Sequence, residues 1–161
     1  MSTSAYSQET AQGLATQSGH DLEAQIESTF REQGFEIIKA SDWNEARLYR
    51  EPDLSAVVLN APYVSIYGHR AKIEFLVLHK GRQILIEAKR QRTSGSTDEK
   101  LPYVFENAKA NIDLGREFIL VMDGDGWKPG AVDWINEQAD ETDNFTVMRI
   151  DEMLSWINEL N

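Results

Sequence analysis

The chain has 161 residues, 41% of them apolar, which is enough for one compact domain with a substantial core. It contains no cysteine, which excludes disulfides and thiolate metal sites, and no apolar run reaches the ~20 residues that span a bilayer. The net charge of −11 argues against a protein that binds nucleic acid over its whole surface. Because no signal-peptide pattern is present at the start, the sequence predicts a cytoplasmic protein outside the membrane.

Residues 1–17 are rich in Ser, Thr, Gln and Ala and are predicted to form a flexible tail, which leaves 18–161 as a single folded domain. From His20 to Gln33, apolar side chains recur every four residues, and this predicts a helix that ends at the following glycine. Beside the apolar stripe lie two glutamates, Glu23 and Glu27. Of these, Glu27 is expected to face solvent.

Two strands are expected after this helix, over Phe35–Ala40 and within Ala56–Tyr67, with a polar segment between them. The next stretch, Ala71–Gln91, is typical of a β-hairpin, because two runs rich in Ile, Val, Leu and Phe flank the two-residue turn Lys80-Gly81.

The register of this hairpin determines which side chains share a face. If the first pair after the turn is His79–Arg82, one side is wholly apolar and carries the pairs Phe75–Ile86, Val77–Ile84 and Ile73–Ala88. The opposite side then carries two like-charged pairs, Glu74–Glu87 and Lys72–Lys89.

Two carboxylates that face each other across a strand pair repel, so a fold that keeps them is expected to bind a cation between them. Carboxylate oxygens suit Mg²⁺, which takes one or two carboxylates together with waters and substrate phosphate. Lys89 lies two residues beyond Glu87 on the same strand face and can reach the same place. The alternative is a solvated sheet face with ordinary Glu–Lys pairing. The apolar pair Leu76–Leu85 on this face favours a partly covered groove.

After the hairpin, Ser96-x-x-Glu99 has capping-box spacing and precedes a predicted helix, Leu101–Asn111. Phe118–Asp123 is expected to be a buried strand that runs parallel to the second hairpin strand, because a helix crosses over before it. Three further elements are predicted: a helix over Ala131–Gln138, a strand over Phe145–Ile150 and a helix over Asp151–Leu160. This order predicts an α/β fold, a three-layer α/β/α sandwich with a mixed central sheet.

Positive charge is concentrated around the hairpin. Eight Lys and Arg but only four acids lie between His69 and Lys100, a local charge of +4 in a chain of −11. Such a patch around two carboxylates suits a phosphate-binding cleft. The alternative is that strand ends and turns simply carry solvated Lys and Arg.

The order acid, hairpin, Glu-x-Lys resembles the PD-(D/E)XK nuclease superfamily, whose members share the restriction-endonuclease-like fold. Glu87-Ala88-Lys89 corresponds to the (D/E)-x-K element, and Gln91 corresponds to a frequent glutamine two residues later. Glu74 stands at the place of the first acid, although Ile73-Glu74 replaces the usual Pro-Asp.

The resemblance extends over residues 18–135. Ser18-Gly19-x-x-Leu22-Glu23 opens a helix in the way typical of these nucleases, where a helix glutamate often joins the metal site. The loop at residues 94–103, with the helix and strand after it, is similar to a subset of restriction-like and phage homing endonucleases.

This resemblance implies a Mg²⁺-dependent DNA endonuclease, in which Mn²⁺ is expected to substitute for Mg²⁺. Glu74 and Glu87 would hold the metal, the backbone carbonyl of Ala88 would be a further ligand, and Glu23 would assist directly or through water. Residues expected to contact DNA are Arg70, Lys72, Arg90, Arg92, Lys100 and Tyr103.

Two further roles follow from the resemblance. Lys89 would orient the attacking water and neutralise charge at the scissile phosphate. Gln91 would position the nucleophile or the adjacent phosphate. Double-strand cleavage by a small one-site domain usually requires a symmetric pair, so a homodimer is expected.

Three functional alternatives remain open from the sequence. A site-specific enzyme of the phage homing or restriction type, which includes a phage-encoded origin, is slightly favoured over a nuclease for branched or single-strand DNA. The third alternative is a non-catalytic acidic protein that mimics DNA on the same fold. The presence of Glu74, Glu87 and Lys89 together argues against it.

Overall fold

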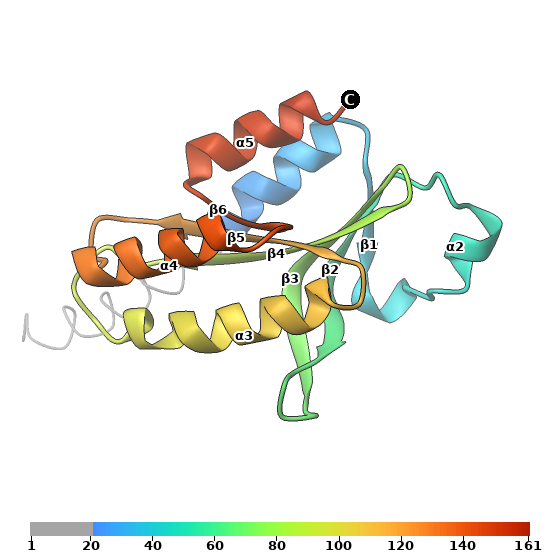
Figure 1. Ribbon diagram of the computed structural model, residues 1–161. Helices are drawn as coiled ribbons and strands as arrows, with labels where there is room; N and C mark the ends of the chain where they lie inside the picture. Colours follow the sequence, from blue (N-terminus) through green and yellow to red (C-terminus); the bar gives the residue numbers. More distant parts are fainter. Residues whose placement is uncertain (1–20) are drawn as a thin grey trace, which may run out of the picture.

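Figure 1 shows a twisted sheet that crosses the molecule with helices on both of its faces. The computed structural model describes residues 21–161, so the predicted tail at residues 1–17 lies outside the described residues. A helix covers residues 21–32. The later elements are β1 (Glu36–Lys39), η1 (Ala40–Asp42), α2 (Arg47–Arg50), β2 (Ala56–Val64), β3 (Arg70–His79), β4 (Arg82–Arg90), η2 (Thr97–Lys100), α3 (Leu101–Ile112), β5 (Glu117–Asp123), α4 (Pro129–Glu141), β6 (Phe145–Met148) and α5 (Ile150–Glu159).

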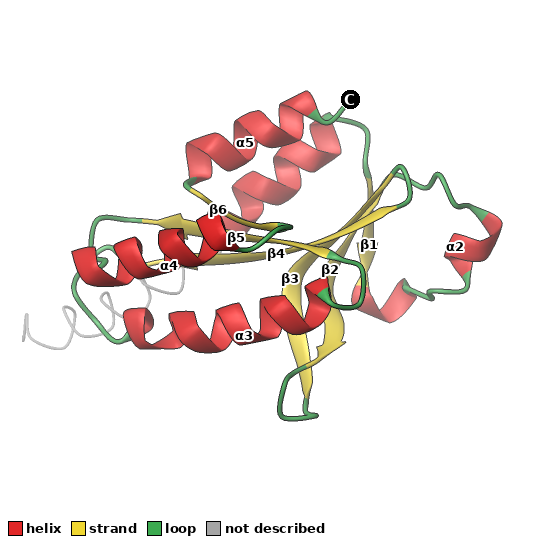
Figure 2. Ribbon diagram, in the orientation of Figure 1, coloured by secondary structure: helices red, strands yellow, loops and turns green. Residues whose placement is uncertain are grey.

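The six strands form one sheet whose strand order is the chain order, β1-β2-β3-β4-β5-β6. β1 and β2 are parallel, β2, β3 and β4 are antiparallel neighbours, and β4, β5 and β6 are parallel. The predicted parallel pairing of β5 with the second hairpin strand is thus confirmed. Helix 21–32 and α5 lie on one face of this mixed sheet, and α3 and α4 lie on the other (Figure 2), which confirms the three-layer sandwich.

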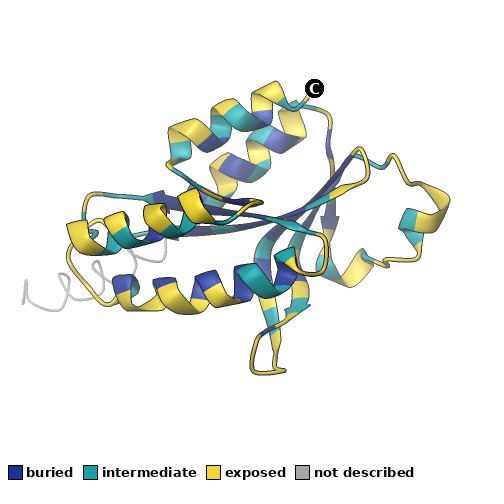
Figure 3. Cartoon of the chain, viewed as in Figure 1, coloured by how far each residue is buried: buried dark blue, intermediate teal, exposed yellow. Residues whose placement is uncertain are grey.

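Two apolar clusters, one on each face of the sheet, form the core, which appears as the dark-blue interior of Figure 3. The face covered by helix 21–32 and α5 is called the N-terminal-helix face, and its buried residues include Leu22, Ile26, Phe30, Phe75, Val77, Ile84, Ile86, Ala88, Met153 and Ile157. The face covered by α3 and α4 is called the α3 face, and its buried residues include Ile73, Leu76, Leu78, Leu85, Leu101, Val104, Phe105, Ala108 and Ile135. Full burial of one such large side chain contributes roughly 1.5–3 kcal/mol.

The predicted hairpin register is confirmed near the turn. β3 and β4 pair from His79–Arg82 to Phe75–Ile86. The turn residues Lys80 and Gly81 both have positive φ, 50° and 78°, and this kind of two-residue turn matches the twist of the flanking strands.

Beyond Phe75–Ile86 the predicted pairing is wrong, because β3 and β4 separate there. β3 continues as the partner of β2, whereas β4 continues as the partner of β5. Between these two described strands, the predicted pairs Glu74–Glu87, Lys72–Lys89 and Ile73–Ala88 are therefore not formed. The side chains confirm the separation, since Ile73 packs on the α3 face and Ala88 on the N-terminal-helix face.

A second irregularity lies beside this separation. β2 and β3 pair regularly on both sides of one gap, where Asn60 lies opposite Glu74. Asn60 has a φ of 52°, in the left-handed region. Residues two apart in a regular strand share a face, yet Phe75 packs on the N-terminal-helix face and Ile73 packs on the α3 face. The alternation of side chains along β3 therefore inverts at Glu74.

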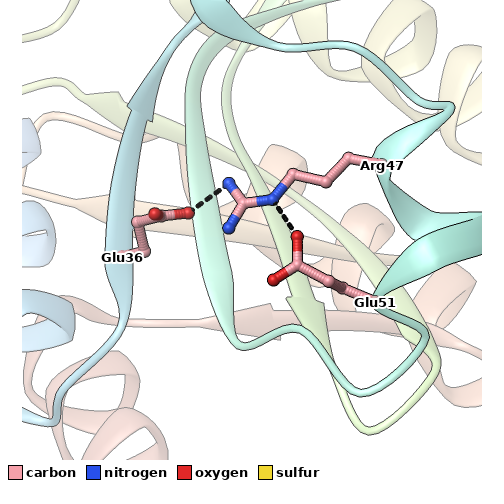
Figure 4. A network of polar contacts seen from close by, with 3 residues as sticks. All are labelled: Glu36, Arg47 and Glu51. Atoms are coloured by element: carbon pink, nitrogen blue, oxygen red, sulfur yellow. Dashed lines mark hydrogen bonds and ion pairs between the residues drawn. The ribbon is translucent and has the colours of Figure 1, made fainter.

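The polar segment between the first two strands contains two short helices, η1 and α2, that were not predicted. At the start of α2, Arg47 donates hydrogen bonds to the carboxylates of Glu51 and of Glu36 on β1 (Figure 4). These bonds, that with Glu51 first, raise the pKa of Arg47 further above its ordinary value. The ion pairs hold the segment against β1, so Arg47 has a structural role that requires no bound ligand.

The entry into α3 also differs from the prediction. Ser96 makes no side-chain capping bond, and the turn η2 leads directly into the helix.

No helix within the described part of the chain combines the length and the apolar character that crossing a membrane requires.

Candidate active site

The two predicted acids lie where β3 and β4 separate. Glu74 is on β3, which is held by β2, and Glu87 is on β4, which is held by β5. The Nζ atom of Lys89 lies 3.0 Å from Oε1 of Glu87, and the two side chains are 28% and 15% exposed. A partly buried ion pair on β4 therefore lies next to the point at which β3, with Glu74, separates from β4.

The carboxyl of Glu74 has an altered acidity. Burial and the negative charge of Glu87 raise the pKa of Glu74 to about 7, with a smaller contribution from Glu23. The positive charge of Lys89 acts in the opposite direction but is outweighed. Glu74 is consequently about half protonated at neutral pH, and added positive charge beside it would favour its ionised form.

Lys89 keeps its charge in this environment. Burial lowers the pKa of Lys89, but the charge of Glu87 and the hydrogen bond with it, supported by Glu74 and Glu23, raise it by more. The net pKa lies above the ordinary value for lysine, so the ammonium is protonated at neutral pH. It can neutralise an anion and orient a water, but it cannot accept a proton there.

Helix 21–32 borders the site from the N-terminal-helix face. A pocket of about 330 Å³ lies between this helix and the β2–β3 strand pair, lined by Glu23, Ala24, Glu27, Leu59, Asn60, Glu74 and Phe75. Glu23 thus shares a pocket with Glu74. Glu27, which was expected to face solvent, also lines the pocket, although its Oε1 pairs with Arg31 Nη2 at 3.4 Å.

The donors available to a metal ion are two carboxylates. Within residues 21–161, no three or more His, Cys, Asp or Glu side chains group closely enough to hold a metal ion. Two carboxylates, Glu74 and Glu87, fit the preference of Mg²⁺ for one or two acids completed by water and phosphate. The roles of Glu23 and of the Ala88 carbonyl stay predictions. The Ala88 side chain is buried on the N-terminal-helix face.

The Gln91 side chain is hydrogen-bonded within two loops. Its Nε2 donates to Asp98 Oδ2 at 3.0 Å and to the Gly126 carbonyl at 2.9 Å, and its Oε1 accepts from the Thr97 N–H at 3.0 Å. Asp98 also accepts from the N–H of Lys128 at 2.9 Å, and these bonds, that from Gln91 first, lower the pKa of Asp98. Gln91 therefore clamps the loop after β4 to the loop after β5.

Glycine makes this clamp possible. A Cβ atom at Gly126 would lie 2.4 Å from the backbone oxygen of Thr93, and one at Gly124 would lie 2.3 Å from the backbone oxygen of Gln91. The two loops touch through their backbones, so no larger residue fits at either position.

The predicted DNA contacts divide into two groups. The first group is exposed to solvent and consists of Tyr103, 39% exposed, and four basic residues, Arg70, Lys72, Arg92 and Lys100. Arg90 differs, because its Nε lies 2.8 Å from Asp123 Oδ2 and its side chain is only 10% exposed. The structure thus commits Arg90 to joining β4 with β5.

Sequence reasoning missed two residues at the site, Asn60 and Tyr63. Burial and the charges of Glu87, Tyr103 and Glu74 raise the pKa of Tyr63 to about 12, so its phenol lies within the field of both acids. The signal for Asn60 was present as a lone polar residue within the apolar run of β2, where Asn tolerates a left-handed backbone better than a branched residue does.

A three-layer α/β/α sandwich on a mixed sheet, with two acids and a lysine where its central strands separate, is the arrangement of the restriction-endonuclease-like fold. A model of the PD-(D/E)XK nuclease superfamily domain matches residues 14–161. The chain belongs to this superfamily, and the resemblance seen in its sequence is confirmed. No curated protein matches the chain.

Proposed function

We propose that this protein is a Mg²⁺-dependent DNA endonuclease, site-specific in the manner of phage homing or restriction enzymes. The observation that carries the proposal is the placement of Glu74 and Glu87 on two separating strands, with Lys89 Nζ 3.0 Å from Glu87. The positive charge around this point, +4 between residues 69 and 100, supports a phosphodiester substrate.

In this proposal Glu74 and Glu87 hold the metal, the Ala88 carbonyl supplies a further oxygen, and Glu23 assists through a water molecule. When bound, Mg²⁺ lowers the pKa of a water molecule and stabilises the charge that develops on the phosphate. Lys89 stays protonated, so its part is to hold the attacking water and to neutralise the scissile phosphate.

A second candidate function is cleavage of branched or single-strand DNA by the same site. A third candidate is a non-catalytic acidic DNA mimic. A mimic has no use for the partly buried pair of Glu87 and Lys89, because its acids would be fully exposed.

The protein is further proposed to act as a homodimer in the cytoplasm. Cutting both strands with one site per chain calls for two chains related by a two-fold axis. Sedimentation with and without a palindromic duplex tests the dimer, since a monomer in both conditions would contradict it.

The function is tested by incubating the purified protein with long duplex DNA in Mg²⁺, in Mn²⁺ and in a chelator. Wild type and two site variants, Glu87→Gln and Lys89→Met, are compared with a control, Glu106→Gln. Glu106 forms a similar ion pair, its Oε1 2.9 Å from Lys109 Nζ, on the exposed surface of α3. The control separates loss of any Glu–Lys pair from loss of this one.

Discrete fragments from wild type and the control, but not from the site variants or in chelator, would support a site-specific metal nuclease. Cleavage only of branched or single-strand substrates would select the second candidate. Cutting that survives in chelator, or that survives Glu87→Gln, would overturn the metal mechanism.

A further inference from the structure

The tip of the β2–β3 hairpin is a structured projection. In Figure 1 it extends past α3, beyond the rest of the sheet. The Ser65 N–H donates to the His69 carbonyl and the Gly68 N–H donates to the Ser65 carbonyl, each at 2.9 Å, and Gly68 has a φ of 77°. The Ile66 N–H donates to Oδ1 of Asn107 at 2.9 Å, and Asn107 on α3 is 2% exposed. The tip is therefore held against α3 in one conformation.

A cluster of exposed apolar side chains lies on this projection and on the adjoining first turn of α3. Among the described residues six large hydrophobic side chains are exposed, and four of them lie here: Val64 at 65%, Ile66 at 42%, Tyr67 at 71% and Tyr103 at 39%. The rings of Tyr67 and Tyr103 stack, with centroids 5.5 Å apart and planes at 18°. Exposed apolar groups gathered in one place mark a binding surface, unlike single scattered ones.

The charge around the cluster identifies the kind of partner. Residues 54–73 contain no Asp or Glu, although the chain as a whole carries −11. Within this stretch two exposed basic residues, Arg70 and Lys72, pair across the hairpin with Val64 and Pro62. Aromatic rings interleaved with Lys and Arg suit a nucleic acid, whose bases stack and whose phosphates are anionic.

The cluster lies near the candidate active site. Arg70 and Glu74 are four residues apart on β3, which corresponds to roughly 13 Å along the strand. Tyr63 lies between the two regions, because it pairs across the hairpin with Ala71, which is between Arg70 and Glu74 on β3. A nucleotide at the tip would therefore be only a few nucleotides from the acids.

We propose that Tyr67, supported by Tyr103, is a stacking platform for unpaired bases of the DNA that the site cleaves, with Arg70 and Lys72 on the adjacent phosphates. The bases must be unpaired and unstacked, because the faces of bases inside a duplex are covered by their neighbours. This inference rests on the proposed DNA nuclease function and favours its second form, in which the substrate is DNA with a single-strand segment beside the cut.

The test measures binding of fluorescent DNA by anisotropy, with the proteins in a Glu87→Gln background so that the DNA stays intact. One probe is a duplex with a single-strand flap and the other is the same duplex fully paired. The variants are Tyr67→Ala and Tyr67→Phe, with Tyr49→Ala as a matched control. Tyr49 is 91% exposed on α2, away from the hairpin.

Tyr67→Ala is expected to weaken binding of the flap probe by about tenfold, because stacking on an aromatic ring provides that order of affinity per base. Tyr67→Phe, which keeps the ring, and Tyr49→Ala should bind as the parent does. Binding of the paired duplex should change by less than about twofold, since phosphate contacts remain.

Three outcomes would overturn the platform: unchanged flap binding in Tyr67→Ala, an equal loss on the paired duplex, or a change of oligomeric state in that variant, which would make the tip a protein contact. Failure of the nuclease function is distinguishable, because it appears as absence of cleavage by the protein without the Glu87→Gln change. If that protein cleaves DNA while flap binding is independent of Tyr67, the platform alone is refuted.

Discussion

Asn60 lies opposite Glu74 at the one gap in the pairing of β2 with β3, and its backbone has a φ of 52°. The inversion of side-chain direction along β3 occurs at the same place, between Ile73 and Phe75. The first acid of the site is therefore set by an irregular backbone, and not by the regular alternation of a strand. Its position depends on a neighbour that sequence motifs do not include.

Substitutions at Asn60 should reveal this dependence. Asn60→Gly, which accepts a left-handed backbone, is expected to keep stability and cleavage close to wild type. Asn60→Val should lose about 1–3 kcal/mol of unfolding free energy and most of the cleavage activity, because a branched residue is strained at this φ. Urea unfolding and initial cleavage rates check both variants. Wild-type behaviour of both variants would show that the backbone conformation is unimportant, whereas loss of activity in both would assign the role to the amide side chain.

The raised pKa of Glu74 predicts how stability depends on pH in the absence of metal. Because its pKa is about 7 in the folded protein and 4.5 in its unperturbed state, the folded protein holds the proton more tightly between these values. Stability contributed by this group therefore falls as pH rises from about 4.5 to about 7. Glu74→Gln should raise the free energy of unfolding by up to about 3 kcal/mol around pH 8 and should give no such gain below pH 4.5.

Urea unfolding of Glu74→Gln and wild type across this pH range, in chelator, measures the effect. Mg²⁺ should then stabilise wild type at high pH and leave Glu74→Gln little changed, which reports on the metal without an activity assay. A variant that is equally stabilised at every pH would contradict the assigned pKa.

Substitutions of Lys89 and of the acids should differ in their effects on Mg²⁺ affinity. Lys89→Met is expected to lower the cleavage rate by at least about 100-fold, because a positioned charge at the phosphate is lost. Its Mg²⁺ affinity should be equal to or tighter than that of wild type, since the ammonium 3.0 Å from Glu87 no longer competes for that carboxylate. Glu87→Gln should lose both cleavage activity and Mg²⁺ affinity. Titration calorimetry with Mg²⁺ supplies the measurement, and weaker binding by Lys89→Met would show that the lysine supports the metal.

Gln91 is expected to act on stability. Gln91→Leu removes three hydrogen bonds and leaves Asp98 and the Thr97 N–H without these partners, so it should cost about 2–4 kcal/mol of unfolding free energy. The exposed Gln25 provides a control, Gln25→Leu, that should change stability by less than about 0.5 kcal/mol. Normal stability with a lower cleavage rate in Gln91→Leu would instead support the phosphate-positioning role that the family resemblance implied.

The regular parts of this fold were predictable because local patterns determine them. The turn at Lys80-Gly81 and the alternation of apolar residues set the register near the turn, and the crossover helix made β5 parallel to β4. The separation of β3 from β4 was not predictable, because it results from each strand pairing more fully with its other neighbour. The sequences of two strands indicate their register but not where their pairing ends, because that depends on competition from a third strand.

The candidate site shows the same division. The motif located Glu74, Glu87 and Lys89, and the structure gathers them at the separation point. The motif could not show that Gln91 is occupied by two loops or that Arg90 is paired with Asp123, since these partners lie about 7 to 35 residues away in the chain. A polar residue next to a motif can take part in catalysis or hold a loop in place. Its contacts in the folded structure, and not the motif, distinguish these two roles.

The separation of the two central strands also has a mechanical meaning. Glu74 belongs to the β1–β2–β3 half of the sheet and Glu87 belongs to the β4–β5–β6 half, and within the sheet the halves are joined by the pairs next to the turn. The halves are thus joined at the end near Lys80-Gly81 and unpaired with each other at the other end. An ion bound by both acids would cross-link the halves at the unpaired end, so backbone amides of β3 near Glu74 should exchange with solvent more slowly when the ion is bound.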